Sequence, residues 1–270
     1  MTKFFEIGKP TPRLDAIEQV TGKAQYLPDL KFPNMLYGAI SRSKVAHGRI
    51  HNIDTHKAER VPGVKAVITS SDFSTARVGF FMEMANKECL VSDRVRFIGD
   101  DIAAIAAETQ ESAEEACSLI EVDLEPLPSV FDPEEALKEN APLIHEDSPG
   151  NIAGEIHKEF GDVAAGFAAS DQVFESTYRT NAVAHCCLET RGALAIVDAH
   201  GRLTIWSSTQ IPHVLREILS MTLNLPVGKI RVRKEYVGGG FGSRQSSDPN
   251  DIICALLAKK TKRPVRLIKS

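Results

Sequence analysis

The sequence predicts a mixed α/β (α+β) fold in which short strands alternate with helices. In several short stretches apolar residues alternate with polar ones, as in strands, and in others they recur at i, i+3 and i+4, as in helices. From Lys229 onward the pattern is strand, glycine-rich loop, helix and strand. With 270 residues, 43% hydrophobic and 25% charged, the chain has the composition of a soluble globular protein of one large domain or two ordinary ones.

The first half contains most of the alternating elements. Thr109 is expected to cap a helix, because apolar residues follow it at the spacing of one helical face. Cys117 lies on that face, where a buried and inert thiol is expected. A shorter helix is expected over residues 53–60. The expected strands cover residues 35–40, 64–68, 102–107 and 121–124.

The second half is expected to contain a strand over residues 172–179 and a hairpin of residues 193–197 and 203–207. A helix should begin at Pro212, and a second at Asp248 as N-cap with Pro249 in the first turn. A strand over residues 265–268 follows. The apolar residues expected to face inward from the first helix are Val214, Leu215, Ile218 and Leu219.

A proline-rich, acidic stretch separates the halves at residues 125–150 and is predicted to connect two bodies. Charge differs across it: residues 108–147 hold thirteen acidic residues and one basic residue, whereas residues 229–270 hold eleven basic and three acidic residues. Solvated helix faces explain the acidic half slightly better than a binding role would. The net charge of −4 argues against a general nucleic-acid binder.

The glycine-rich loop at Gly238–Gly242 is the feature that most strongly suggests a ligand. Four glycines in five positions cost folding free energy, and backbone that lies against a ligand is a common reason to keep them. A tight turn between two elements is the structural alternative. A dinucleotide-binding turn is a weaker alternative, because Ser243 replaces the last glycine of that motif and no acidic residue follows the next strand.

The cellular setting is predicted to be the cytoplasm. The five cysteines show no C-x-x-C spacing, which suits reduced thiols. Met1 to Phe5 run directly into Glu6, so no secretory signal peptide is expected, and no apolar run reaches the length of a membrane span.

A series of short motifs occurs in one order along nearly the whole chain. Together they resemble the molybdopterin-binding large subunit of the xanthine dehydrogenase and aldehyde oxidase family. The order is more specific than any single motif. The motifs are Gly22–Tyr26, Ala46–Ile50, Ala58–Val64, Ile98–Ala103, Gly161–Val163, His185–Thr190, Ser208–Gln210 and Val237–Gly242.

The resemblance implies an a/b hammerhead-like domain at residues 1–135, a linker at 136–155 and the N-terminal part of a molybdopterin-binding domain at 156–270. The family hydroxylates an electron-poor carbon of a heteroaromatic or aldehyde substrate with oxygen derived from water. Its cofactor is molybdenum–molybdopterin, in some members as a cytosine dinucleotide, with no direct protein ligand to the metal. The implied partners are an iron–sulfur subunit carrying [2Fe-2S] clusters, an FAD subunit, the rest of the cofactor domain and a small-molecule substrate, without nucleic acid or membrane.

The resemblance also assigns roles to residues. Gln210 resembles the glutamine that hydrogen-bonds an oxygen ligand of molybdenum. The loop that approaches the metal and pterin is matched by Gly239, Gly240, Phe241 and Gly242, with Arg244 as a further cofactor contact. His185 and Glu189 match another motif, although their spacing equally suits a structural pair on one helical face.

Two departures from the family pattern affect function. Gln245 stands where purine-oxidising relatives carry a glutamate, which argues against a xanthine-type substrate. The family's general-base glutamate is expected outside these 270 residues, so the isolated chain is expected to be inactive. A non-catalytic assembly or binding module with the same fold remains an alternative, as does, more weakly, a nucleotide-binding enzyme that uses the glycine loop.

Overall fold

The computed structural model describes residues 7–72, 77–79 and 85–269. The segment Met1 to Glu6, on which the expectation of no signal peptide rests, lies outside the described residues. Within the described ranges, no helix is both long enough and apolar enough to cross a membrane.

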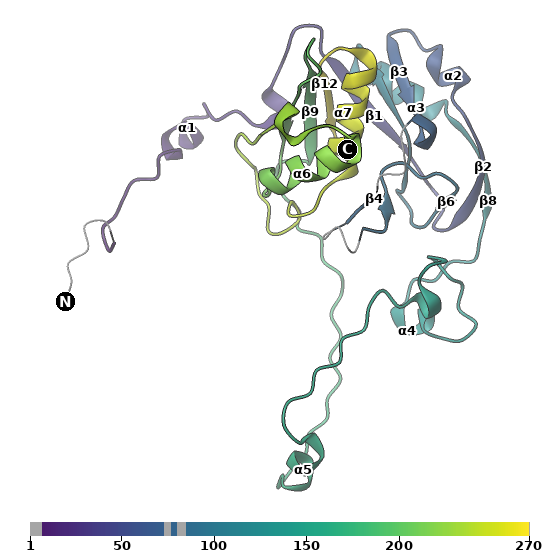
Figure 1. The fold of residues 1–270 in the computed structure, drawn as a ribbon, viewed down its shortest axis with the longest axis vertical. Helices are drawn as coiled ribbons and strands as arrows, with labels where there is room; N and C mark the ends of the chain where they lie inside the picture. The colour runs from purple at the N-terminus through teal and green to yellow at the C-terminus, as the bar shows by residue number, and fades with distance from the viewer. Residues whose placement is uncertain (1–6, 73–76, 80–84, 270) are drawn as a thin grey trace.

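A seven-stranded sheet forms the centre of the molecule and takes strands from both ends of the sequence (Figure 1). Its order is β11-β10-β9-β12-β1-β7-β3. The pairs β1/β12 and β10/β11 are parallel, and the other neighbours are antiparallel. Its strands are β1 (Leu36–Arg42), β3 (Val64–Ile68), β7 (Asp101–Ala107), β9 (Gly192–Val197), β10 (Leu203–Ser207), β11 (Ile230–Arg233) and β12 (Val265–Ile268).

The pairing of β1 with β12 joins the two halves of the chain. Leu36 lies opposite Val265 in this parallel ladder, and both side chains are fully buried in one core. The halves therefore share a sheet and a hydrophobic core. The boundaries at residues 135 and 156, and the idea that each half folds by itself, stay predictions.

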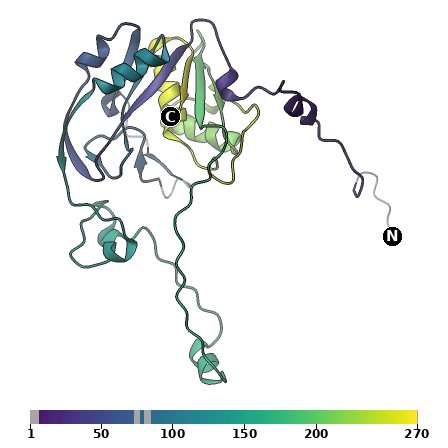
Figure 2. The same cartoon turned by 180° about the vertical axis from the view of Figure 1, so that it is seen from behind.

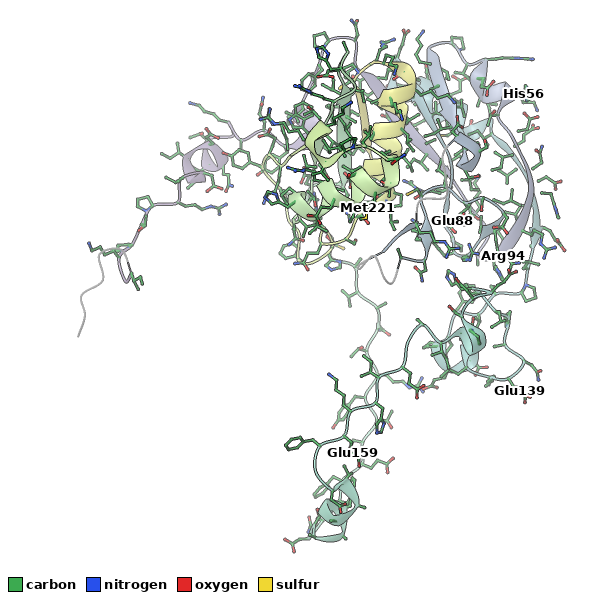
Figure 3. The ribbon with its side chains drawn as sticks, in the orientation of Figure 1. His56, Glu88, Arg94, Glu139, Glu159 and Met221 are labelled. Atoms are coloured by element: carbon green, nitrogen blue, oxygen red, sulfur yellow. The ribbon has the colours of Figure 1, made fainter. Side chains whose placement is uncertain are left out.

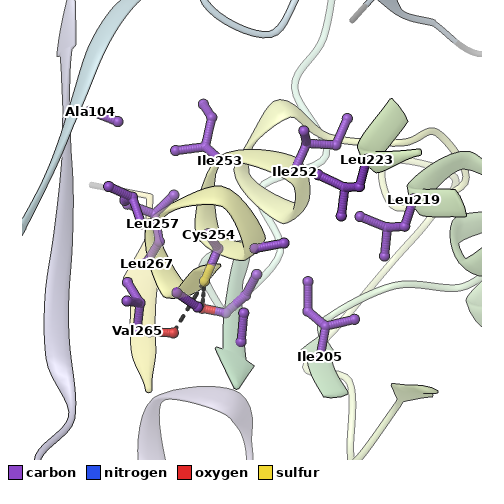
Figure 4. Close-up of a cluster of buried hydrophobic side chains, with 14 of the residues drawn as sticks. Ala104, Ile205, Leu219, Leu223, Ile252, Ile253, Cys254, Leu257, Val265 and Leu267 are labelled. Atoms are coloured by element: carbon purple, nitrogen blue, oxygen red, sulfur yellow. Dashed lines mark hydrogen bonds between the residues drawn. The ribbon is translucent and has the colours of Figure 1, made fainter. Parts of the chain in front are cut away.

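Helices cover both faces of this sheet. On one face lie α6 (Pro212–Leu223) and α7 (Pro249–Thr261); Ile252, Ile253 and Leu257 of α7 pack against Ala104 and Leu267 (Figure 4). On the other face lie α2 (His56–Glu59) and α3 (Gln110–Ser118), with the buried Ala113 and Ala116 of α3 against β3 and β7.

Smaller elements lie outside the seven-stranded sheet. A three-stranded sheet has the order β6 (Arg94–Val95), β2 (Gly48–Asp54), β8 (Glu121–Pro126), and a two-stranded one pairs β4 (Arg77–Val78) with β5 (Lys87–Glu88). The remaining helices are α1 (Ala16–Val20), α4 (Pro133–Ala136) and α5 (Val163–Ala168), with 3-10 turns η1 (Leu27–Asp29), η2 (Ser70–Asp72), η4 (Pro149–Asn151) and η5 (Val227–Lys229).

The predicted helix starts are confirmed by their caps. Thr109 accepts a hydrogen bond from the N–H of Ser112 at 3.1 Å, and Asp248 accepts one from Asn250 at 2.9 Å. Burial raises the pKa of the Cys117 thiol to about 12, in agreement with an inert role. Asn224 ends α6 in the left-handed conformation.

Three local predictions are wrong. Residues 172–179 form no strand, because none of the described strands lies beside them. Val214 is 47% exposed and does not face the core. The helix expected over residues 53–60 is only one turn long, since β2 continues to Asp54.

A long segment, residues 152–186, extends away from this body and carries α5 near its tip (Figures 1 and 2). We call it the arm. Every residue of the arm is exposed. The N-terminal segment with α1 also extends outward.

Candidate functional site

The glycine loop follows β11 and turns back across the start of α6. Gly239 and Gly242 have φ of 105° and 93°, which L side chains rarely adopt, so glycine is required at both positions. Phe241 between them has φ of 50°, an uncommon value for a residue with a side chain. Its ring is 75% exposed. The loop is therefore a defined structure with one large apolar group at its open side.

Gln210 packs directly on this loop. A Cβ atom added at Gly240 would lie 2.6 Å from Cδ of Gln210, well inside any real contact. Gln210 immediately precedes α6, whose first turn contains Pro212. The Gly238–Gly242 loop thus meets the segment that follows β10.

The hydrogen bonds of Gln210 fix the direction of its amide group. Its backbone N–H donates to the carbonyl of Arg244 at 2.9 Å, and its Oε1 accepts from the N–H of Arg244 at 3.3 Å. Among the described residues, Nε2 donates no hydrogen bond. Because the oxygen is engaged, the amide presents its NH₂ group, a donor, as the free end.

A buried ion pair supports the loop from behind. Arg244 Nη1 lies 2.8 Å from Oε2 of Glu189, and the two side chains are 2% and 5% exposed. The same Oε2 accepts from the N–H of Gly238 at 2.8 Å, and Arg244 Nη1 also donates to the carbonyl of Ser208 at 3.2 Å. Arg244 Nη2 donates to the carbonyl of Glu189. This pair connects the glycine loop, the end of β10 and residue 189.

Three charged residues hold the far end of the loop. Arg191 donates to the carbonyls of Ser243 and Ser246 at 2.7 and 2.5 Å. It also pairs with Asp248 at 3.1 Å, as Lys269 does at 3.0 Å. Burial alone would raise the pKa of Asp248, but the two cations and the N–H of Asn250 outweigh it, so the pKa lies below its ordinary value.

The segment before Glu189 lines the loop as well. Cys187 Sγ lies 3.7 Å from the carbonyl oxygen of Gly240 and 3.5 Å from Oγ of Ser243. The helical spacing proposed for His185 and Glu189 is wrong, because residues 181–190 contain no helix. Glu189 instead lies in a bend, where it is held by Arg244 and Gly238.

The predicted site residues divide into two groups. Gln210 packs against Gly240, whereas Gly239 packs against Cys187 in the same loop. Phe241 and Gln245 are exposed. The side chain of Arg244, by contrast, lies inside the protein, where its guanidinium is occupied by Glu189 and Ser208. It therefore supports the loop and does not line its open side.

Sequence reasoning missed most of this support. The roles of Arg191, Lys269 and Cys187 were not predicted, nor was the pairing of Glu189 with Arg244. The motif around Glu189 signalled that the residue matters. Its partner is 55 positions away, and only the fold shows that they meet. Within the described part of the chain, no group of three or more His, Cys, Asp or Glu side chains has the arrangement of a metal site.

Two family models match two parts of the chain. Residues 21–128 match the aldehyde oxidase and xanthine dehydrogenase a/b hammerhead domain, and residues 144–270 match the molybdopterin cofactor-binding domain. The nicotinate dehydrogenase large molybdopterin subunit of Eubacterium barkeri is 38% identical over 100% of this chain and 63% of its own length. The xanthine dehydrogenase molybdenum-binding subunit of Escherichia coli is 34% identical over 94% of this chain and 35% of its own.

Solved structures have the same fold. Quinoline 2-oxidoreductase from Pseudomonas putida 86 matches with a TM-score of 0.92 and 32% identity over 99% of this chain. Aldehyde oxidoreductase from Desulfovibrio desulfuricans matches with a TM-score of 0.88 and 27% identity over 97%. This chain spans 35% and 30% of those two chains, respectively.

Proposed function

The chain belongs to the molybdopterin-binding large subunits of the xanthine dehydrogenase and aldehyde oxidase family, and from this we propose that it forms one wall of the cofactor site of a molybdenum hydroxylase. The reaction proposed is hydroxylation of an electron-poor carbon with oxygen derived from water. The observation that carries the proposal is the amide of Gln210, which is held against Gly240 with its NH₂ group free.

The residues around the loop fit the molybdenum–molybdopterin cofactor. A donor fixed at one point suits an oxygen ligand of a metal centre, because such an oxygen accepts hydrogen bonds. The loop has no side chains at Gly239, Gly240 and Gly242. Its backbone N–H groups can therefore approach a large polar ring system closely. Phe241 would contribute an apolar contact at the open side. These are the residues that we propose to hold the cofactor.

The bound cofactor would supply the two-electron redox chemistry. The residues of this chain would orient the cofactor and restrain its position. Gln210 would donate a hydrogen bond at a fixed position. The ion pair of Glu189 with Arg244 would hold the loop and this amide in fixed positions relative to each other. Donors that are already in place cost no reorganisation when the reaction occurs.

The substrate is proposed to be a nitrogen heteroaromatic compound. Nicotinate dehydrogenase, nicotine 6-hydroxylase and quinoline 2-oxidoreductase are among the proteins to which this chain is similar, and their names refer to such compounds. Gln245 is exposed one residue beyond Arg244. Its neutral amide could donate to a ring nitrogen or a carboxylate, whereas a glutamate would repel a carboxylate.

The assembly is proposed to include polypeptide that completes the cofactor site, an iron–sulfur subunit with [2Fe-2S] clusters and an FAD subunit. Relatives described as large subunits support this, for example the nicotine 6-hydroxylase large subunit and the carbon monoxide dehydrogenase large chain. A cytosine dinucleotide form of the pterin and a cytoplasmic location belong to the same proposal. The five free cysteines are compatible with a reducing compartment.

Metal analysis of the assembled protein tests the proposal. The chain, tagged and purified with whatever assembles with it, should contain molybdenum and a releasable pterin. With nicotinate or quinoline and an artificial electron acceptor in water enriched in ¹⁸O, the product should gain one labelled oxygen. The chain purified alone should bind neither metal nor pterin tightly. An assembly without molybdenum, or a product oxygen taken from O₂, would overturn the proposal.

A further inference from the structure

The motif Gly22–Tyr26 has no part in the site described above. It lies in an N-terminal segment, residues 15–26, which we call the strap and which contains α1. After α1 the chain turns back on itself, because the carbonyl oxygen of Glu18 accepts hydrogen bonds from the N–H groups of Lys23 and Ala24 at 2.9 and 3.0 Å. The motif therefore closes a loop on α1 and leads the chain from this helix to Tyr26.

The strap is anchored to the body where it ends. The N–H of Tyr26 donates to the carboxylate of Asp29 in η1 at 2.9 Å. Leu27, the next residue, is 4% exposed and packs in a hydrophobic cluster with Leu194 and Trp206 of the central sheet. In contrast, α1 buries none of its residues and stands to one side of the body (Figure 3). The strap thus joins an exposed helix to the packed core.

The strap contacts the chain just before the glycine loop. The hydroxyl of Tyr236 donates a hydrogen bond to Oε2 of Glu18 in α1. The ring of Tyr236 also lies 6.0 Å from the ring of Tyr26, measured between centroids, with the ring planes tilted by 49°, as in common aromatic pairs. The turn made by the motif Gly22–Tyr26 thus brings α1 and Tyr26 to the same side chain.

The segment between β11 and the glycine loop depends on this contact. Among the described residues, the backbone groups of positions 235–237 form no hydrogen bond. The next residue, Gly238, is held by Glu189 from the other side. The side chain of Tyr236 therefore provides the hydrogen bond that connects this segment to a distant part of the chain.

The contact between the strap and this segment is narrow. A cleft of about 490 Å³ lies between Arg13, Asp15, Glu18 and Gln19 on one side and residues 234–237 on the other. Within the described part of the chain, the hydrogen bond from Tyr236 is the only one that crosses this cleft. Donation to Glu18 raises the pKa of the Tyr236 phenol to about 12, so the hydroxyl keeps its proton at neutral pH.

We propose that Tyr236 is a positioning residue for the glycine loop, held in place by Glu18 and Tyr26 of the strap. Tyr236 precedes Gly240 by four residues, and the amide of Gln210 packs against Gly240. A shift of the segment before the loop would move the loop and, with it, the free NH₂ group of this amide. The inference rests on the proposed function in assigning a catalytic consequence to that movement.

Hydrogen–deuterium exchange of the 270-residue chain tests the contact without any cofactor. Tyr236→Phe removes the hydroxyl and keeps the ring. Amides of residues 237–240 should exchange roughly two- to tenfold faster in this variant, which is the effect of one net hydrogen bond. The thermal midpoint should stay the same, because α1 buries no residue. Unchanged exchange at these amides would overturn the inference.

Variants of Glu18 separate the hydrogen bond from a general effect on α1. Glu18→Leu removes the acceptor and should match Tyr236→Phe, and the double variant should exchange no faster than either single variant. Glu18→Gln keeps an acceptor oxygen and should retain slow exchange. Tyr178→Phe is the control, because this tyrosine is 88% exposed in the arm. Additive effects in the double variant, or a Glu18→Gln that exchanges like Glu18→Leu, would overturn the inference.

Kinetics of the assembled enzyme test the consequence for the site. In Tyr236→Phe and Glu18→Leu, kcat per bound molybdenum should fall roughly two- to tenfold, whereas Glu18→Gln should turn over normally. KM should change little, because neither residue is proposed to touch the substrate. Normal kcat per molybdenum in all three variants would overturn the inference and leave the proposed function intact. An assembly without molybdenum would overturn the proposed function, while faster exchange in Tyr236→Phe would still support the role of the strap.

Discussion

Glu189 and Arg244 form a buried ion pair, with 2.8 Å between Oε2 and Nη1 and side chains that are 5% and 2% exposed. A pair removed this fully from water is held by further hydrogen bonds, here from Gly238 to Glu189 and from Arg244 to Ser208. Its effect is to bind the glycine loop to the end of β10, where Gln210 follows. The geometry of the candidate site thus depends on two residues that lie behind it.

The first prediction concerns the cost of breaking this pair. Arg244→Met leaves the carboxylate of Glu189 buried without its cation, which should lower the free energy of unfolding by about 3–5 kcal/mol. Lys57→Met, at the exposed pair of Lys57 with Glu121, should lower it far less, because solvent screens that pair. Urea denaturation of both variants measures the difference.

A double variant separates the charge effect from a general loss of packing. Glu189→Leu combined with Arg244→Met removes both charges, so it should be more stable than Arg244→Met alone. A double variant that is less stable than either single variant would show that the pair does not act as described.

The second prediction concerns Gln210. Gln210→Ala in the assembled enzyme should lower kcat by roughly ten- to hundredfold, the equivalent of one hydrogen bond to a charged group. Stability should change little, because only one weak contact, with the N–H of Arg244 at 3.3 Å, is lost inside the protein. His213→Ala, exposed in the first turn of α6, is the control and should turn over normally. Unchanged kinetics in Gln210→Ala would make Gln210 an ordinary surface residue.

The third prediction uses the contact between Gly240 and Gln210. Gly240→Ala places a Cβ atom 2.6 Å from Cδ of Gln210, so the amide must move. The decrease in kcat should approach that of Gln210→Ala. The double variant should have a kcat only slightly lower than either single variant. Gly228→Ala, which meets no atom within 4 Å, should have wild-type activity. Additive losses would show that Gly240 acts independently of the amide.

The sequence predicted those features whose cause is local. Thr109 and Asp248 are recognisable as caps, because each side chain accepts a hydrogen bond from an N–H only two or three residues away. Such a contact depends on the local sequence alone. The meeting of Gln210 with the glycine loop was predicted through a family resemblance. No local pattern connects two segments that are 30 residues apart.

Features that depend on distant partners could not be predicted. The alternation at residues 172–179 predicts a strand, but alternation describes only side-chain faces, and a strand also needs a neighbour. The pairing of Leu36 with Val265 and the ion pair of Glu189 with Arg244 are set by the whole fold. Sequence spacing carries no information on either.

The fourth prediction concerns pH. Burial raises the pKa of Asp251 from its ordinary 3.8 to about 7, with Asp248 adding to the effect and Arg191 opposing it. The unfolded chain then releases this proton near pH 4 while the folded chain keeps it until about pH 7, so stability should fall as pH rises between these values. Above that range this contribution is constant.

Asp251→Asn should reduce this slope, because an amide does not titrate. Asp100, whose pKa burial raises to about 6, gives a slope of the same sign, so Asp100→Asn is the comparison. Asp248, with its lowered pKa, acts only at lower pH and in the opposite direction. Urea denaturation of the three proteins at about pH 5 and about pH 8 checks this. The free energy of unfolding should change less between these pH values in Asp251→Asn than in the wild type. An equal change in both proteins would contradict the assignment.

The last prediction concerns the connection between the two halves. Proteases cut first where backbone is exposed and free of partners, and all of residues 152–186 are exposed. Limited proteolysis of the chain alone should therefore cut within the arm before residues 36–42 or 249–268. The connection predicted near residues 125–150 should be cut next. Within it, the short α4 and η4 turns should resist cleavage.

The nicked pieces should stay together. The ladder of β1 with β12 and the core between α7 and the strands β3 and β7 join residues on either side of every such cut. Separating them would expose Leu36, Ile68, Ile253 and Val265, all fully buried, and each large apolar side chain costs about 1.5–3 kcal/mol to expose. Size-exclusion chromatography of the nicked protein, followed by denaturing gel electrophoresis of the peak, measures this. Two peaks under native conditions would instead establish two independently stable bodies, with the shared sheet too weak to hold them.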